Sequence, residues 1–108
     1  MLYCLVGPQR IQITPRAESY SPNDKLYCSA DGNPNPSCTW IDLDANMEVA
    51  KECLFLINEY ATRDQVYNYQ CKAENTIVGV KHVKSANITF RIKGQTGLPN
   101  RFLCYLST

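Results

Sequence analysis

Cysteines are the residues of this 108-residue chain with the greatest capacity for chemistry, as metal ligands, nucleophiles or disulfide partners. There are six: Cys4, Cys28, Cys38, Cys53, Cys71 and Cys104. Zinc sites need clustered ligands such as CxxC pairs, which these spacings lack, and the chain has a single histidine. We therefore expect no metal and no cofactor. Six cysteines in so short a chain indicate an oxidising compartment, and hence an extracellular or cell-surface location.

Carboxylates and the histidine give little support for catalysis. Asp42 and Asp44, like Glu48 and Glu52, are neighbours only in the sequence, and an acid–base pair also needs a cleft that separates their pKa values. His82 lies among lysines on a predicted strand, where a solvated polar residue is the simpler interpretation. There is no glycine-rich phosphate loop and no nucleophile motif. We predict that the protein is not an enzyme.

The composition narrows the class of partner. Charged residues make up 19% of the chain and the net charge is +1, so no basic field exists to attract nucleic acid. The hydrophobic fraction of 44% argues against disorder, and the length fits one domain. The longest apolar run after the first residues, 53–57, is too short to span a bilayer. A protein partner remains the expected ligand.

Alternating apolar and polar residues predict strands rather than helices. Period-two patterns occur over 10–14, 25–30, 66–74 and 80–93. A further strand carries Cys38 and Trp40, after a loop at 31–36 whose prolines and glycine break regular structure. The run 53–57 is apolar at every position, so its own pattern does not say which side chains face inward. The chain is predicted to be all-β.

Several spaced residues carry a family resemblance: Cys28, Ala30-x-Gly32-Asn33-Pro34-x-Pro36, Trp40, Tyr69-x-Cys71 and Ala73-x-Asn75. With them, the stretch 28–92 resembles the I-set/C2-like immunoglobulin domains of cell-adhesion molecules, and 30–40 looks like the hemicentin-like tandem immunoglobulin proteins of invertebrates. The resemblance implies an immunoglobulin-like antiparallel β-sandwich of about seven strands. There are two departures. The glycine that usually precedes the tyrosine is missing, and a cysteine stands two places before the tryptophan.

The resemblance also assigns the central core residues. It implies a disulfide between Cys28 and Cys71 that joins the two sheets, with Trp40 packed beside it. Tyr69, two residues before Cys71, is then the tyrosine whose hydroxyl bonds back to the corner between the fifth and sixth strands of the fold.

A second bridge is predicted between Cys38 and Cys53. The family pattern turns Phe55, Ile57 and Tyr60 inward, and this choice turns Cys53 inward as well. Cys38 then faces it from a strand of the other sheet, at a separation that disulfide geometry allows. The alternative is that both are small buried hydrophobes with free thiols.

The ends of the chain are interpreted separately from the domain. Residues 1–8 are read as the remnant of a preceding domain or a linker, because a Gly-Pro junction is typical of tandem immunoglobulin arrays. Residues 9–93 form the immunoglobulin-like domain, and 94–108, which lack strand alternation, are a linker or a non-native tail. Cys4 and Cys104 lie in these flanks, and the residues do not decide whether they pair with each other, with other domains or not at all.

The functional prediction is a non-catalytic extracellular module for cell adhesion or protein recognition, expected to be an excerpt of a tandem-domain cell-surface protein. Its expected partners are a homophilic or heterophilic cell-surface protein and neighbouring immunoglobulin domains of the parent protein. Two surfaces are candidates: the face carrying Gln70, Lys72, Glu74, Thr89 and Arg91, or Leu54 and Leu56 if these point outward. The alternatives are a module in the ectodomain of a receptor kinase and a purely structural spacer. An intracellular muscle-type array is disfavoured by the cysteine count.

One glycosylation site is predicted. Asn87-Ile88-Thr89 is a valid sequon on a predicted strand, and the alternation places Asn87 on the outward side. The other candidate, Asn35-Pro36-Ser37, is blocked by its proline.

Overall fold

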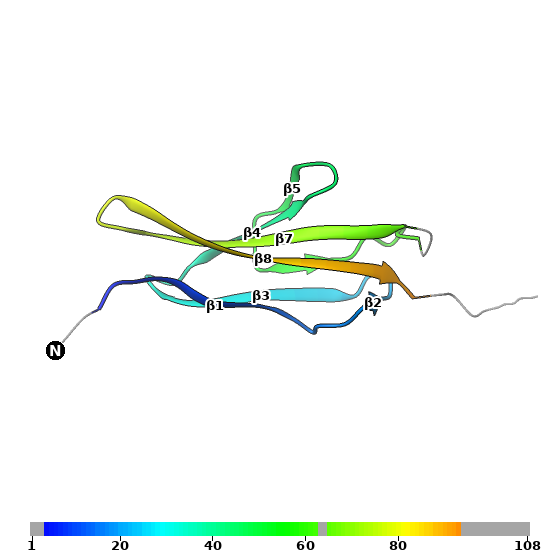
Figure 1. The fold of residues 1–108 in the computed structure, drawn as a ribbon, viewed down its shortest axis with the longest axis horizontal. Coiled ribbons are helices and arrows are strands. Elements are labelled where there is room, and N and C mark those ends of the chain that lie inside the picture. The colour runs from blue at the N-terminus through cyan, green and yellow to red at the C-terminus, as the bar shows by residue number, and fades with distance from the viewer. Residues whose placement is uncertain (1–3, 63–64, 94–108) are drawn as a thin grey trace, which may run out of the picture.

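The computed structural model describes residues 4–62 and 65–93, and within them the chain is all-β. Eight strands form two sheets, and the described residues contain no helix (Figure 1). The predicted all-β sandwich is therefore confirmed. It has one strand more than the seven expected.

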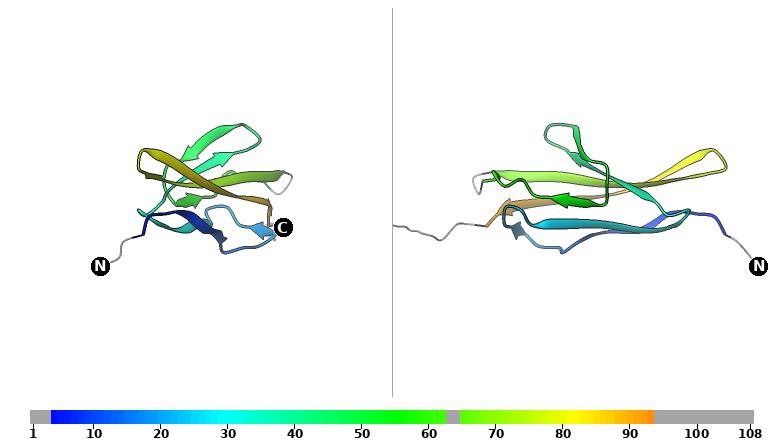
Figure 2. Two further views of the ribbon diagram at one scale, coloured as in Figure 1. Left: turned by 60° about the vertical axis from the view of Figure 1, so that its left-hand side comes forward. Right: turned by 180° about the vertical axis from the view of Figure 1, so that it is seen from behind.

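The strand bounds are β1 Val6–Thr14, β2 Ser19–Tyr20, β3 Lys25–Asn33, β4 Ser37–Asp42, β5 Met47–Ala50, β6 Leu54–Leu56, β7 Val66–Ile77 and β8 Val80–Ile92. One sheet has the order β1-β3-β6 and the other β2-β8-β7-β4-β5. All neighbours are antiparallel except β2 and β8. Figure 2 shows the two sheets stacked, with the β4–β5 pair rising away from the three-stranded sheet.

A long hairpin of β7 and β8 forms the centre of the larger sheet. Its register is continuous from Val66↔Arg91 to Ile77↔Val80, and only Val78 and Gly79 form the turn. Both turn residues have positive φ, 49° and 76°, as a two-residue hairpin turn of type I′ requires. The turn was predicted at 75–79. It is shorter because the two strands continue to pair up to the tip.

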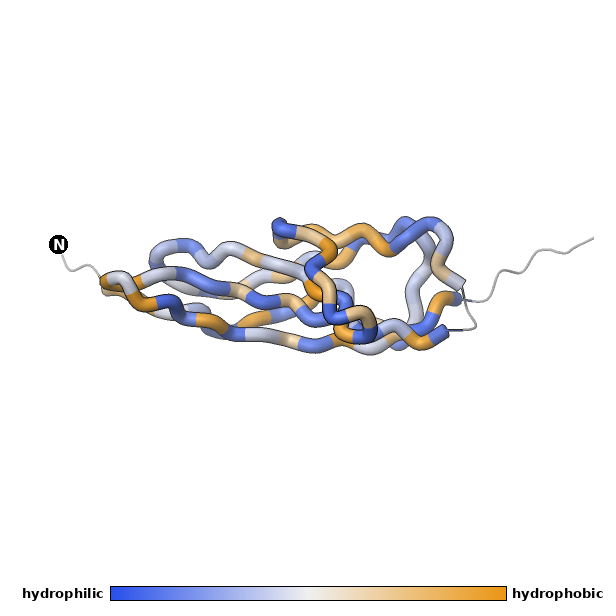
Figure 3. The backbone as a smooth tube through the Cα atoms, turned by 90° about the horizontal axis from the view of Figure 1, so that it is seen from above, coloured by the Kyte–Doolittle hydropathy of each residue, from blue (hydrophilic) through white to orange (hydrophobic). Residues whose placement is uncertain are grey.

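The core lies between the sheets and follows the predicted alternation. Trp40 and Leu26 are fully buried, and Ile88, Phe90 and Ile92 face inward at every second position of β8. Hydrophilic and hydrophobic residues alternate visibly along the strands in Figure 3. The period-two interpretation of β3 and β8 is thus confirmed.

The prediction that Tyr60 faces inward is wrong. Phe55 and Ile57 are buried as expected, but Tyr60 is 80% exposed. Strand β6 ends at Leu56, and the chain then turns about Asn58, whose Oδ1 accepts a hydrogen bond from the Tyr60 backbone N–H at 2.7 Å. The inward facing that the family pattern implies therefore holds for Phe55 and Ile57 but not for Tyr60.

At its start, β1 includes residues 6–8 of the segment that was read as a remnant. Val6 is registered with Asn33, and its carbonyl accepts a hydrogen bond from Asn75. The proposed domain boundaries at 8 and 94 stay predictions, and 94–108 lie outside the described residues. Among the described residues there is no helix of the length and apolarity needed to cross a membrane.

Candidate functional site

Four cysteines form the covalent centre of the sandwich. Cys28 on β3 is bonded to Cys71 on β7, with their Cα atoms 6.4 Å apart. Cys38 on β4 is bonded to Cys53, just before β6, with Cα atoms 4.8 Å apart. The sulfurs of Cys28, Cys38 and Cys71 all lie within 4.8 Å of one another. Since each is bonded, they are not free thiolates of the kind that bind metals.

Trp40 packs beside this centre. Its Nε1 donates a hydrogen bond to the Cys53 carbonyl at 3.1 Å, and the same carbonyl accepts the backbone N–H of Cys28 at 2.9 Å. The indole stacks on Phe55 with ring centroids 5.3 Å apart. Cys38 Sγ lies 3.8 Å from the Cys28 carbonyl, a packing contact, because an oxidised sulfur carries no proton to donate. The indole and the two bridges therefore hold the sheets together as one unit.

The tyrosine hydroxyl that binds the corner before β7 is not the one that was predicted. Tyr69 is half-buried and stacks on Phe90 at 5.8 Å; burial, and then the charge of Asp42, raise the pKa of its hydroxyl. The hydroxyl that binds the corner is that of Tyr67, which accepts the Thr62 N–H at 2.9 Å. Tyr69 was expected to make this contact. The tyrosine that makes it, Tyr67, lies two residues earlier on β7.

A second tyrosine anchor, at β2, was not predicted. The Tyr20 hydroxyl donates to the Pro15 carbonyl at 2.6 Å and accepts the Ala17 N–H at 2.8 Å. Its ring lies edge-on to Phe90 at 5.1 Å. Tyr20 thereby fixes the segment that leads from β1 across to the larger sheet. The aromatic residue flanked by turn residues was the only available signal.

The outer face of β7 and β8 is mainly polar, with two exposed valines, Val66 and Val83. Several of its polar side chains bond to one another. Gln70 Nε2 donates to Asn87 Oδ1 at 3.0 Å, and Thr89 Oγ1 donates to Asn68 Oδ1 at 2.6 Å. The face includes the five residues predicted for it: Gln70, Lys72, Glu74, Thr89 and Arg91. Further along it, Lys81 pairs with Glu74 at 3.7 Å. Much of its hydrogen-bonding capacity is therefore used within the domain.

The outer face of the smaller sheet carries apolar side chains instead. Tyr27 on β3 is 49% exposed and Leu56 on β6 is 51% exposed. Leu54, directly opposite Tyr27 in the register, completes what we call the β3–β6 patch: Tyr27, Leu54 and Leu56. The two leucines were considered as outward residues from the sequence. The outward position of Tyr27 follows from the buried positions of Leu26 and Cys28 on either side of it.

Comparison with known proteins gives one distant relative. No family model matches the chain. It is 36% identical over 67 residues to neuronal growth regulator 1 of Gallus gallus. The match covers 62% of this chain and 19% of that relative, so the chain spans about a fifth of the relative's length. With the two-sheet sandwich and its disulfides, this distant similarity is consistent with an immunoglobulin-like domain.

The polar residues considered for catalysis have structural contacts or open surroundings. Asp42 Oδ1 accepts the backbone N–H groups of Asp44 and Ala45, which closes the turn before β5. Glu48 pairs with Lys51 at 3.7 Å. His82 and Glu52 are exposed, and neither is placed beside the aspartates by strand pairing. Asp42 and Glu48 thus make contacts within the domain.

The pairing of the two flanking cysteines, Cys4 and Cys104, stays a prediction. Cys4 is exposed and has no disulfide partner among the described residues. Cys104 lies outside the described residues, so its pairing remains an open prediction.

We predict that Asn87 is glycosylated when the chain passes through a eukaryotic secretory pathway. Asn87 is exposed on β8, and its side chain contributes only Oδ1 to the bond with Gln70, which leaves Nδ2 available for the glycan. Thr89→Val should abolish a glycosidase-sensitive band on a gel, whereas Thr89→Ser should keep it. Asn35→Gln, in the blocked sequon, is the matched control. A glycosidase-sensitive band that survives Thr89→Val would place the glycan elsewhere.

Proposed function

We propose that this chain is a non-catalytic, extracellular immunoglobulin-like module for cell adhesion or protein recognition. Its two disulfides suit an oxidising compartment. The distant similarity to neuronal growth regulator 1 supports a role at the cell surface. The partner is another cell-surface protein, either a further copy or a different chain.

The observation that carries this proposal is the contrast between the two sheet faces. The polar face of β7 and β8 satisfies much of its own hydrogen bonding, as the Gln70–Asn87 and Asn68–Thr89 contacts illustrate. The β3–β6 patch presents an aromatic and an aliphatic side chain, Tyr27 and Leu56, each about half exposed. Protein interfaces gain affinity from a few such anchors surrounded by polar residues. A glycan on Asn87 would shade the polar face and leave the patch accessible.

The contact made by one module is expected to be weak. Three side chains cannot supply the roughly 800 Å² per partner that a stable interface buries, so the patch is the centre of a small interface. Repetition of such modules along a tandem chain multiplies weak contacts through effective concentration. Adhesion through an array is therefore more consistent with this surface than tight binding by one domain.

The test compares one copy of the 108-residue chain with two copies in tandem, each displayed on beads. We measure bead clustering, for homophilic binding, and capture on a panel of cultured cells, for heterophilic binding. Tandem copies should bind about a hundredfold more strongly than single copies. Leu56→Asp should remove most of this binding, because it places a charge at the centre of the apolar contact.

Val49→Asp is the matched control, since Val49 is a similarly exposed apolar residue, at 43%, on the other sheet. It should leave binding unchanged. Negligible binding by both single and tandem forms would favour a spacer that only positions its neighbours. The full-length gene would decide whether the module belongs to the ectodomain of a receptor kinase.

A further inference from the structure

Strand β8 has one long edge that lacks a strand partner over most of its length. On this side β2 pairs with only two residues of β8, through the N–H groups of Arg91 and Lys93, which donate to the carbonyls of Glu18 and Tyr20 at 3.2 and 2.8 Å. Among the described residues, no other strand is paired with this edge. Unpaired strand edges are templates for the addition of a further strand.

The continuous register of the hairpin identifies which backbone groups face this edge. Because Arg91 points its N–H away from β7 and no bulge interrupts the strand, Ser85, Asn87 and Thr89 do the same. The carbonyl of Asn87 confirms this direction, since it accepts a hydrogen bond from an Arg16 guanidinium nitrogen at 3.2 Å. A row of backbone donors and acceptors thus continues from the point where β2 ends.

β1 runs beside this row without pairing with it, and hollows lie between the two strands. β1 stays paired with β3 as far as Thr14, and the chain crosses to β8 only in the segment 15–18. Three hollows lie along β8. The first, of about 400 Å³, is beside His82–Lys84, the second, of about 350 Å³, is beside Ala86, and the third, of about 670 Å³, is beside Thr89–Arg91. The second hollow exists because Ala86 has the smallest side chain in the inward row of β8 and leaves part of the volume beside it unfilled.

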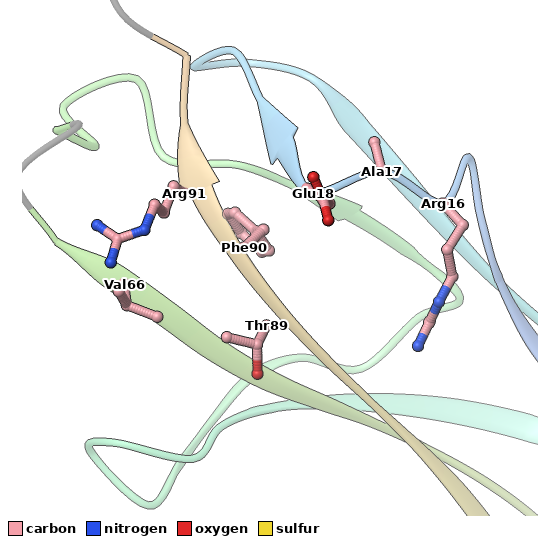
Figure 4. Close-up of a pocket in the computed structure, with 7 residues that line it drawn as sticks. All are labelled: Arg16, Ala17, Glu18, Val66, Thr89, Phe90 and Arg91. Atoms are coloured by element: carbon pink, nitrogen blue, oxygen red, sulfur yellow. The ribbon is translucent and has the colours of Figure 1, made fainter.

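The charges along this edge favour one kind of occupant. Lys84, Arg16 and Arg91 line the hollows, and none has an acidic partner within the described part of the chain. Arg16 and Arg91 lie at opposite ends of the largest hollow, with Glu18 between them as its one acidic residue (Figure 4). A second copy would bring the same basic residues to the contact and be repelled, whereas an acidic segment would be attracted.

We propose that the free edge of β8 binds an extended peptide segment rich in aspartate and glutamate, which adds to the larger sheet in line with β2. The backbone of the segment would pair with Ser85, Asn87 and Thr89, and it would replace the Arg16 guanidinium at the Asn87 carbonyl. At about 3.3 Å per residue, some seven residues span positions 83–89. Its carboxylates would pair with Lys84, Arg16 and Arg91, and small apolar side chains would fill the hollow over Ala86. This surface is separate from the β3–β6 patch, so the inference goes beyond the proposed function.

The test is a titration of the isotope-labelled 108-residue chain with the blocked heptapeptide Glu-Glu-Val-Val-Val-Glu-Glu, followed by NMR. Its glutamates lie on both faces of the added strand, as Lys84 in the inward row and Arg91 in the outward row require. The amide signals of Ser85, Asn87 and Thr89 should shift, and their hydrogen exchange should slow. A lysine–valine heptapeptide should not bind. A glutamate–valine peptide that is N-methylated at every residue, and so has no backbone N–H to donate along either side, should also fail.

Variants of the chain locate the contact. Lys84→Glu should weaken binding of the acidic peptide about fivefold, the upper range for one exposed ion pair, while Lys72→Glu, the same change on the outer face of β7, should have no effect. Ser85→Pro removes one outward N–H without touching the β7 side and should weaken binding more. Equal binding of the methylated peptide, shifts confined to β5 or β6, or self-association through this edge would each overturn the proposal. The methylated peptide keeps the test valid if Ser85→Pro does not fold.

Discussion

Replacing both Cys28 and Cys71 by alanine is expected to lower the free energy of unfolding by about 4 kcal/mol. The bridge closes a loop of 43 residues, and the chain-entropy model gives about 4 kcal/mol for that length. Replacing Cys38 and Cys53 removes a 15-residue loop and should cost less, about 3 kcal/mol. Chemical denaturation followed by the fluorescence of the single tryptophan, which lies beside both bridges, measures the two losses.

The exposed Cys4 provides the control, because Cys4→Ser should change stability by no more than about 0.5 kcal/mol. Peptide mapping of secreted protein without reduction should recover both linkages. Free, alkylated Cys38 or Cys53 would remove the second bridge and leave the first standing. An equal or larger loss from the Cys38–Cys53 variant would show that loop length does not set the order.

Much of the fold could be predicted because strand alternation is a local signal. The first half of β3 and the second half of β8 each bury one side chain in two, and Leu26, Cys28 and Phe90 were assigned from that period. The signal fails where a strand is short. β6 has three residues, and the chain then turns at the side chain of Asn58. The family pattern, counted back from Cys71, therefore put Tyr60 on the wrong side.

The candidate surfaces were only partly predictable, because they depend on which strands pair. The facing of Leu54 and Leu56 came from the family resemblance, since an unbroken apolar run has no period of its own. The open edge of β8 has no local signal at all. It arises because β1 pairs with β3 as far as Thr14, and the Tyr20 hydroxyl then binds Pro15 and brings only two residues to β8. Which sheet a segment joins depends on residues far apart in the sequence, so local patterns do not predict it.

Asn75 also shows why a residue that carries the family resemblance was difficult to interpret from sequence. It is 7% exposed on β7, and its Nδ2 donates to the carbonyls of Val6 and Pro34 at 2.8 and 2.9 Å. One side chain therefore ties β1 and the turn after β3 to the larger sheet. Gly32 makes room for it, because a Cβ there would lie 3.2 Å from Asn75 Nδ2 and 2.8 Å from Pro36 Cγ. Gly32, Pro34, Pro36 and Asn75 thus form one contact.

Asn75→Asp is expected to destabilise the domain by about 4 kcal/mol at neutral pH. The change keeps the shape but replaces two donated hydrogen bonds by an anion against two carbonyl oxygens, and an unsatisfied buried group costs about 1–3 kcal/mol, more when charged. Asn75 Oδ1 already has no partner among the described residues, so the site offers the carboxylate no compensating donor. Thermal and chemical unfolding measure the loss.

The pH dependence of the stability of this variant distinguishes the penalty of the buried charge from the loss of the two hydrogen bonds. Burial and the two carbonyls raise the folded-state pKa of the new carboxyl above its unfolded value of about 3.9. The folded state then holds the proton more tightly, so the penalty is complete above the raised pKa and shrinks as the pH falls towards the unfolded pKa.

Asn75→Ala, which loses the same two bonds without a charge, should cost about 2 kcal/mol at every pH. Asn87→Asp, on the exposed face of β8, should change stability by no more than about 0.5 kcal/mol. If Asn75→Asp and Asn75→Ala were equally destabilising at every pH, the carboxylate would carry no penalty of its own, and the expected effect of a buried anion against the two carbonyls would be wrong.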